Sequence, residues 1–200
     1  LSGGSTPRPV YEALGKSEEI DWSKVWIFLV DERHVPEDDD ESNTKLIQDT
    51  LMASAEIPPA QFIHPQDLPL EEWLPNYEGA LAEVLGDGFP DVVVLGMGED
   101  GHIASLFPPI PVAEDRDLPL RSSKGGFPLT IHTTTDQFAV HDRISVTLPV
   151  LTNAGAKIFL LKGEGKKKVW EEMEGSEEGV ERWPAKAILE SGDVSVVSQW

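Results

Sequence analysis

The sequence contains no cysteine, which excludes disulfide bonds and thiolate metal sites. Its apolar runs, such as 25–30, 92–95 and 158–161, are far too short for membrane-spanning helices. Basic residues are scarce, since 16 Lys and Arg face 36 Asp and Glu and leave a net charge of −20. A nucleic-acid-binding surface would need clustered basic residues, so we expect neither a nucleic-acid partner nor a membrane partner. A cytoplasmic enzyme fits these absences.

This strongly negative charge also limits the kind of substrate site that the chain can build. An anionic substrate would meet long-range repulsion, which a local pocket of backbone N–H groups and a few cations would have to overcome. The 200 residues, 40% hydrophobic and 26% charged, suffice for one domain with a substantial core. We therefore expect a single domain over 1–200, in which basic residues near glycine-rich turns are informative.

Strand-like and helix-like segments alternate along the chain. Strands are predicted at 24–30, 92–95, 143–148, 157–161 and 194–198, with a short hairpin at 129–135. Helices are predicted after Thr6, from an N-cap at Ser42, after Pro75, and at 149–154 and 166–173. This alternation favours an α/β fold with a mostly parallel sheet and helices on both faces. The Pro-, Gly-, Ser- and Thr-rich segment 108–142 is predicted to be a long surface excursion.

The segment 96–108 carries the strongest indication of a site. The apolar run 91–95 stops at two glycines, and Asp100 and His102 follow at once. Glycine lets the backbone turn tightly and approach a ligand, and open α/β sheets bind ligands at the carboxyl ends of their strands. Histidine is well suited to proton transfer near neutral pH. The alternative is a turn with a solvated histidine, but the density of Gly, Asp and His favours a site.

A second indication is the Ser-Gly-Gly-Ser-Thr-Pro segment at 2–7. Thr6 is a plausible N-cap, and Pro7 suits the first position of a helix that runs through Tyr11. A glycine-rich turn at a helix start presents free backbone N–H groups, which favours phosphate binding. The predicted phosphate loop comprises Ser2, Gly3, Gly4, Ser5 and Thr6. Alone this signal is weak, because most such loops bind nothing.

A third group of polar residues, Asp31, Glu32 and Arg33, follows the strand predicted to end at Val30. Charged side chains at a solvent-exposed strand end would give the same pattern, so this interpretation explains the group as well as a functional site does. In the functional interpretation Arg33 binds a phosphate while an acid orients a sugar hydroxyl. Because all three segments would follow strands, they are expected to converge on one edge of the sheet.

In combination, residues 2–7 (SGGSTP), 31–36 (DERHVP) with Ser42-Asn43, and 98–108 (GEDGHIASLFP) resemble the 6-phosphogluconolactonase family. Weaker matches follow in the same order at 143–151 and 163–166. The resemblance implies a Rossmann-like α/β fold shared with sugar-phosphate isomerases. It also implies hydrolysis of 6-phosphoglucono-δ-lactone in the pentose phosphate pathway. Members carry a helix and a strand before the Ser-Gly-Gly loop, so we expect these residues to be a fragment that lacks them.

The resemblance further implies roles for the acid–base residues. His102 would be the general base that takes a proton from water as it attacks the lactone carbonyl, and would return it to the ring oxygen. Asp100 or Asp31 would orient the imidazole or a sugar hydroxyl. The backbone at 98–101 would stabilise the oxyanion. No metal or organic cofactor is expected, because a lactone is already an activated ester.

By the same resemblance, the phosphate would lie on residues 3–6, helped by Arg33, Arg143 or Lys166. A glucosamine-6-phosphate deaminase is the nearest alternative, because it shares a similar loop and Asp-Gly-His segment. That family has an acid five positions after the histidine, where this chain has Phe107. A non-catalytic sugar-phosphate sensor on the same fold is a third possibility. The sequence leaves the oligomeric state open.

Overall fold

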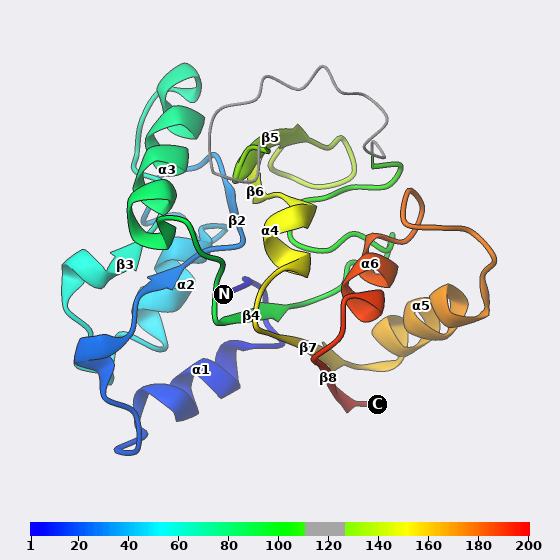
Figure 1. Cartoon of the computed structure of the whole chain (residues 1–200), viewed down its shortest axis with the longest axis horizontal. Helices are drawn as coiled ribbons and strands as arrows, with labels where there is room; N and C mark the ends of the chain where they lie inside the picture. Colours follow the sequence, from blue (N-terminus) through cyan, green and yellow to red (C-terminus); the bar gives the residue numbers. More distant parts are fainter. Residues whose placement is uncertain (111–126) are drawn as a thin grey trace.

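The structure is a computed structural model that describes residues 1–110 and 127–200 (Figure 1). The helices are α1 (Arg8–Gly15), α2 (Asn43–Asp49), α3 (Leu70–Leu85), α4 (Leu148–Thr152), α5 (Glu164–Gly175) and α6 (Pro184–Glu190), with short 3-10 helices at Trp22–Lys24 and Pro59–Gln61. The strands are β1 (Ile27–Phe28), β2 (Asp31–Arg33), β3 (Phe62–Ile63), β4 (Val92–Leu95), β5 (Thr130–Thr134), β6 (Asp142–Val146), β7 (Ala156–Lys162) and β8 (Val194–Gln199).

Most strand pairs are parallel. The strands β4, β7 and β8 form one parallel sheet, and β1 and β3 form a parallel pair. The strands β2, β6 and β5 form an antiparallel sheet, which Figure 1 shows at the end of the molecule opposite α1 and α5. The predicted α/β class with a mostly parallel sheet is confirmed.

Two cores lie on opposite faces of the parallel sheet. Val93 and Leu95 of β4 pack into a core that includes residues of α3, α4, α5 and α6. Val94, between them, packs into a second core with Tyr11 of α1 and Ile47 of α2. Successive side chains of a strand point to opposite faces, so this alternation shows that helices cover both faces, as predicted.

The prediction for the segment 24–33 is wrong in detail. A 3-10 turn replaces the start of the expected strand, and β1 is confined to Ile27–Phe28. Asp31, Glu32 and Arg33 do not lie in a loop at the end of that strand but form β2 themselves, paired antiparallel with β6. Asp and Glu are poor strand formers in general, so tertiary pairing with β6 overrides their propensity here.

Other boundaries also differ from the predictions. Helix α3 begins at Leu70 and contains Pro75, because burial of Trp73 and Tyr77 on one face stabilises the turn before the proline. Thr6 is not an N-cap; Pro7 holds that position without a side-chain hydrogen bond. The predicted cap at Ser42 is confirmed, since its side chain accepts from the Lys45 N–H.

The carboxyl-terminal half follows the predictions more closely. The strands β7 and β8 and the helix α5 lie where they were expected. The predicted strand 143–148 ends earlier, because β6 stops at Val146 and Leu148 begins α4. The expected short hairpin becomes β5, which pairs with β6. Helix α6 and strand β3 were not predicted. Of the excursion predicted at 108–142, residues 111–126 lie outside the described residues.

No helix within residues 1–110 and 127–200 is long and apolar enough to cross a membrane. The amino-terminal loop is joined to the strands, because the Val30 N–H donates to the Leu1 carbonyl at 2.9 Å. This bond places Leu1 beside Val30, just before β2, and residues 2–7 line one cavity together with Gly96 and Met97, which follow β4.

Candidate active site

A cavity of about 510 Å³ lies where the three polar segments meet. Of the site residues predicted from the sequence, those that line it are Ser2, Gly3, Gly4, Ser5, Thr6, Asp31, Arg33, His102, Arg143 and Lys166. Asp100 contacts His102 but is not among the lining residues. The lining also includes residues that the sequence analysis did not assign to the site, among them Glu41, Asn43, Glu99 and Phe138.

His102 and Asp100 form a hydrogen-bonded pair, with His102 Nδ1 2.5 Å from Asp100 Oδ1. Burial alone would raise the pKa of the Asp100 carboxyl, but the hydrogen bond and charge interaction with His102 outweigh it and hold this pKa below its ordinary value. A carboxylate can only accept a hydrogen bond, so Nδ1 carries the proton. In the neutral imidazole, Nε2 is then the basic nitrogen.

The turn 98–101 fixes this pair through close backbone packing. A Cβ on Gly98 would overlap the His102 ring and lie 2.5 Å from Asp100 Oδ1, so only glycine fits there. The Gly98 N–H donates to the His102 carbonyl at 2.8 Å, and the Gly101 N–H donates to the Gly98 carbonyl at 3.1 Å. Because these two N–H groups are used within the turn, they do not supply the oxyanion stabilisation expected from them.

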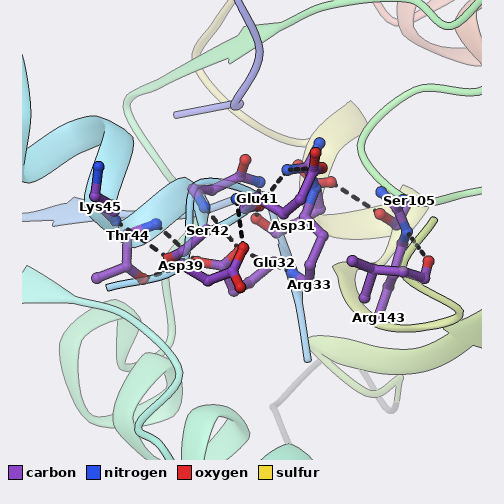
Figure 2. Close-up of polar contacts among 12 residues, drawn as sticks. Asp31, Glu32, Arg33, Asp39, Glu41, Ser42, Thr44, Lys45, Ser105 and Arg143 are labelled. Carbon is purple, nitrogen blue, oxygen red and sulfur yellow. Dashed lines mark hydrogen bonds and ion pairs between the residues drawn. The ribbon is translucent and has the colours of Figure 1, made fainter. Parts of the chain in front are cut away.

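Asp31 contacts different partners from Asp100. Asp31 is only 6% exposed, and its Oδ2 accepts a hydrogen bond from Ser105 Oγ at 2.8 Å (Figure 2). The Ser105 N–H in turn donates to Ser145 Oγ at 3.2 Å. Of the two candidate carboxylates, therefore, Asp100 contacts the imidazole, while Asp31 lines the cavity.

The loop 2–6 presents its backbone to the cavity. Gly4 has a φ of +95°, a left-handed conformation that glycine adopts without strain. A Cβ on Gly3 would overlap the Asn43 amide, so the loop packs directly against the start of α2. Within the described part of the chain, the N–H groups of residues 4–6 donate to no protein acceptor. Free N–H groups before a helix suit an anion.

Two arginines enter the cavity from adjacent strands. Arg33 of β2 is the cross-strand partner of Arg143 of β6. Arg33 donates to the Glu41 carbonyl and lies 3.6 Å from the Glu41 carboxylate, as Figure 2 shows. Burial, together with the charge of Arg33, lowers the pKa of Arg143. The Arg143 guanidinium also lies 5.6 Å from the ring centre of Phe107 and 5.3 Å from that of Phe138.

Lys166, in the first turn of α5, adds a third cation to the lining. Burial lowers its pKa, and the charges of Glu99 and Asp100 partly oppose that change. An exposed lysine would show no such effect, so the shift reflects the position of Lys166 inside the cavity.

Glu32 is the main feature that the sequence analysis missed. Its buried carboxylate accepts hydrogen bonds from the N–H groups of Asn43 and Thr44, at 2.9 and 2.7 Å, and from the Thr44 hydroxyl at 2.8 Å (Figure 2). It also accepts from the Arg33 N–H at 2.7 Å. Burial raises the pKa of Glu32, and these donors partly offset the rise. Glu32 thus connects β2 to α2. The predicted N-cap at Ser42 was the feature of the sequence that could have indicated this contact.

Aromatic rings surround the other side of His102. The Phe107 ring centre lies 4.7 Å from that of the imidazole, and the Phe138 ring centre lies at 5.4 Å in an edge-on arrangement. Position 107, where an acid would favour a deaminase, therefore presents an apolar ring to the histidine. Within residues 1–110 and 127–200, no group of three or more His, Cys, Asp or Glu is placed to hold a metal ion.

The chain is similar to known proteins over nearly its whole length. A family model described as glucosamine-6-phosphate isomerases/6-phosphogluconolactonase matches residues 1–197. A probable 6-phosphogluconolactonase of Dictyostelium discoideum is 44% identical over 200 residues, covering 98% of this chain and 81% of the relative. A 6-phosphogluconolactonase of Synechocystis is 33% identical, covering 97% and 78%. The solved structure of 6-phosphogluconolactonase from Plasmodium vivax superimposes with a TM-score of 0.83 at 30% identity, covering 99% and 76%.

Proposed function

Because the chain belongs to the family of glucosamine-6-phosphate isomerases and 6-phosphogluconolactonases, we propose that it hydrolyses 6-phosphoglucono-δ-lactone to 6-phosphogluconate. One observation carries the proposal: His102, which is hydrogen-bonded to Asp100, lines the same cavity as the arginine pair Arg33–Arg143. A substrate with a hydrolysable carbonyl and a distant phosphate suits such a cavity. The reaction belongs to the oxidative pentose phosphate pathway, for which we expect a cytoplasmic location.

In the proposed mechanism His102 acts as the general base. Nε2 accepts a proton from water as the water oxygen attacks the lactone carbonyl, forming a tetrahedral intermediate. The intermediate collapses with cleavage of the bond to the ring oxygen, and the imidazolium returns the proton to that oxygen. Asp100 holds Nδ1 in its protonated form throughout and stabilises the transient positive charge. Such acid–base help is typically worth ~10²–10⁴-fold in rate.

The phosphate would be held by the N–H groups of residues 3–6 and by Arg33, Arg143 or Lys166. The two guanidinium groups offer forked donors that match phosphate oxygens. Phe107 and Phe138 flank Arg143 and so direct its guanidinium. Asp31, held by Ser105, is placed to accept a hydrogen bond from a sugar hydroxyl. In this arrangement local cations and free N–H groups overcome the repulsion that the net charge of −20 exerts on an anionic substrate.

Phe107 supports the lactonase over the deaminase. Amine chemistry on a sugar phosphate needs a further acid for ring opening, and the resemblance places that acid at position 107. A phenylalanine ring 4.7 Å from the imidazole cannot exchange protons. Ester hydrolysis needs only the base and water, both of which this cavity accommodates.

A direct assay on two substrates tests the proposal. Freshly generated 6-phosphoglucono-δ-lactone should be hydrolysed far faster than its spontaneous rate, whereas glucosamine 6-phosphate should release no ammonia. Release of ammonia would show that the chain is a deaminase and contradict the lactonase proposal. Binding of 6-phosphogluconate without turnover of either compound would leave the sugar-phosphate sensor as the correct interpretation.

A further inference from the structure

The segment between α5 and α6 reaches across the fold to the turn that carries the acid–base pair. Arg182 Nη1 donates a hydrogen bond at 2.8 Å to the backbone carbonyl of Asp100, 82 residues earlier in the chain. The same guanidinium lies 3.7 Å from the ring centre of Trp183, which is only 1% exposed. Arg182 therefore connects the Asp100 backbone to a side chain anchored in the core.

The turn itself packs directly on these two residues. Gly101 has a φ of +92°, and a Cβ there would lie 2.7 Å from Trp183 Cζ3 and 2.8 Å from Arg182 Nη1. No side chain fits at this position, so the backbone between Asp100 and His102 rests against the Arg182–Trp183 pair. Any displacement of that pair would move the turn.

Within the described part of the chain, the hydrogen bonds to the Asp100 carboxylate all come from His102 and reach one oxygen. Oδ1 accepts from the His102 ring at 2.5 Å and from the His102 N–H at 3.2 Å, but Oδ2 is buried and has no hydrogen-bond partner among the described residues. A carboxylate held through one oxygen depends on its backbone for the direction in which it points. The bond from Arg182 to the Asp100 carbonyl supplies that constraint.

We propose that Arg182 is a positioning residue for the Asp100–His102 pair, fixing the backbone of Asp100 so that its carboxylate meets Nδ1 of His102. The expected effect of Arg182 on catalysis rests on the proposed function, whereas its effect on the geometry of the pair does not. Arg182 acts through Asp100 and does not line the cavity that His102 faces.

A purely structural role for Arg182 would be to hold its own segment, but that segment has other ties. Lys186 Nζ donates to the carbonyls of Ser176 and Glu178, at 2.5 and 2.7 Å. The Ile110 N–H donates to the Glu181 carbonyl at 3.0 Å. Lys186→Met therefore loosens the same segment without touching Asp100, and is the matched control.

The experiment compares Arg182→Met, Arg182→Lys and Lys186→Met with the unaltered chain. Three quantities are measured: kcat and KM for freshly generated lactone, the Kd of 6-phosphogluconate, and the ¹⁵N chemical shifts of the His102 ring. We expect Arg182→Met to lower kcat about tenfold, since small misplacements of catalytic groups are costly. KM and Kd should stay within about twofold, because phosphate binding does not involve the turn. The ¹⁵N shifts should move from a single Nδ1–H tautomer toward a mixture.

Arg182→Lys, which keeps the charge and a donor, should recover part of kcat and of the tautomer signal. It also covers the case in which Arg182→Met does not fold. Unchanged ring shifts in the arginine variants would overturn the proposal, as would an equal loss of kcat in Lys186→Met. If the unaltered chain hydrolyses no lactone, the proposed function fails, while the ring shifts still decide the role of Arg182.

Discussion

Arg33 and Arg143 are direct partners across the antiparallel strands β2 and β6, so two guanidinium groups lie on one face and line one cavity. Like charges directly opposite each other destabilise a sheet. Burial is the larger cause of the lowered pKa of Arg143, and the charge of Arg33 lowers this pKa further, which reflects the same repulsion. An anion between the two groups would remove the repulsion, which is why we place the phosphate there.

Replacing Arg33 with Met should weaken recognition of the phosphate specifically. A hydrogen bond to a charged group is worth about 1.5–3 kcal/mol, so KM for 6-phosphoglucono-δ-lactone should rise roughly 10- to 100-fold. KM for unphosphorylated glucono-δ-lactone should change little. Steady-state kinetics on both lactones measures the difference.

Lys45→Met is the control for Arg33→Met, because Lys45 pairs with Asp40 and Asp49 on the exposed side of α2. Its KM for both lactones should match that of the unaltered chain. An equal rise of KM for the two lactones in Arg33→Met would remove Arg33 from the phosphate site.

Replacing His102 with Ala should abolish most catalysis without abolishing binding. We expect kcat to fall by ~10²–10⁴-fold, the usual contribution of a general base. Asp100→Asn should cost less, on the order of tenfold, because an amide oxygen still accepts from Nδ1 but carries no charge. Lactone kinetics and calorimetric titration with 6-phosphogluconate measure the two effects separately.

Asp136→Asn is the matched control for Asp100→Asn, because it removes an exposed carboxylate that lies 3.4 Å from His141. It should leave kcat unchanged. A His102→Ala variant that hydrolyses the lactone at the normal rate would refute the general-base assignment.

Lys166 should make phosphate binding sensitive to alkaline pH. Because burial lowers its pKa, Lys166 loses its proton at a lower pH than an ordinary lysine, whose pKa is about 10.4. The phosphate keeps its charge over this range, since its second pKa is about 6. The Kd of 6-phosphogluconate should therefore rise as pH increases toward 10, by roughly tenfold once the lysine is neutral.

Lys166→Arg should remove this rise, because arginine stays protonated throughout the range. Lys168→Arg, at an exposed position in the same helix, should follow the unaltered chain. Calorimetric titrations between pH 7.5 and about pH 10 compare the three proteins. Identical pH profiles for the unaltered chain and Lys166→Arg would show that Lys166 does not contact the phosphate.

Gly98→Ala should separate the acid–base pair without unfolding the protein. The added Cβ would overlap the imidazole and crowd Asp100 Oδ1, so the pair must shift and kcat should fall at least roughly tenfold. Gly79→Ala, in α3 with open space around it, should keep full activity and gain about 0.5–1 kcal/mol of stability. Thermal unfolding and lactone kinetics on both variants check this, and normal kcat in Gly98→Ala would contradict it.

Local pattern predicted the parts of the fold where packing and propensity agree. Val93, Val94 and Leu95 form an apolar run of β-branched and aliphatic residues, and β4 lies there with both faces covered. The prediction failed where tertiary contacts override local preference. Pro75 lies inside α3, and the charged residues of β2 form a strand because β6 pairs with them.

The sequence by itself determined the chemistry that is available: a glycine-bounded turn with Asp100 and His102, a loop with free N–H groups, and a few cations in an acidic chain. These depend on residue types and short spacings, which local sequence contains. Only the tertiary structure decided that Asp31 contacts Ser105, which leaves Asp100 as the partner of the imidazole, and that Arg182 reaches the same turn. Contacts between residues tens of positions apart depend on how sheets and helices pack, which no local pattern specifies.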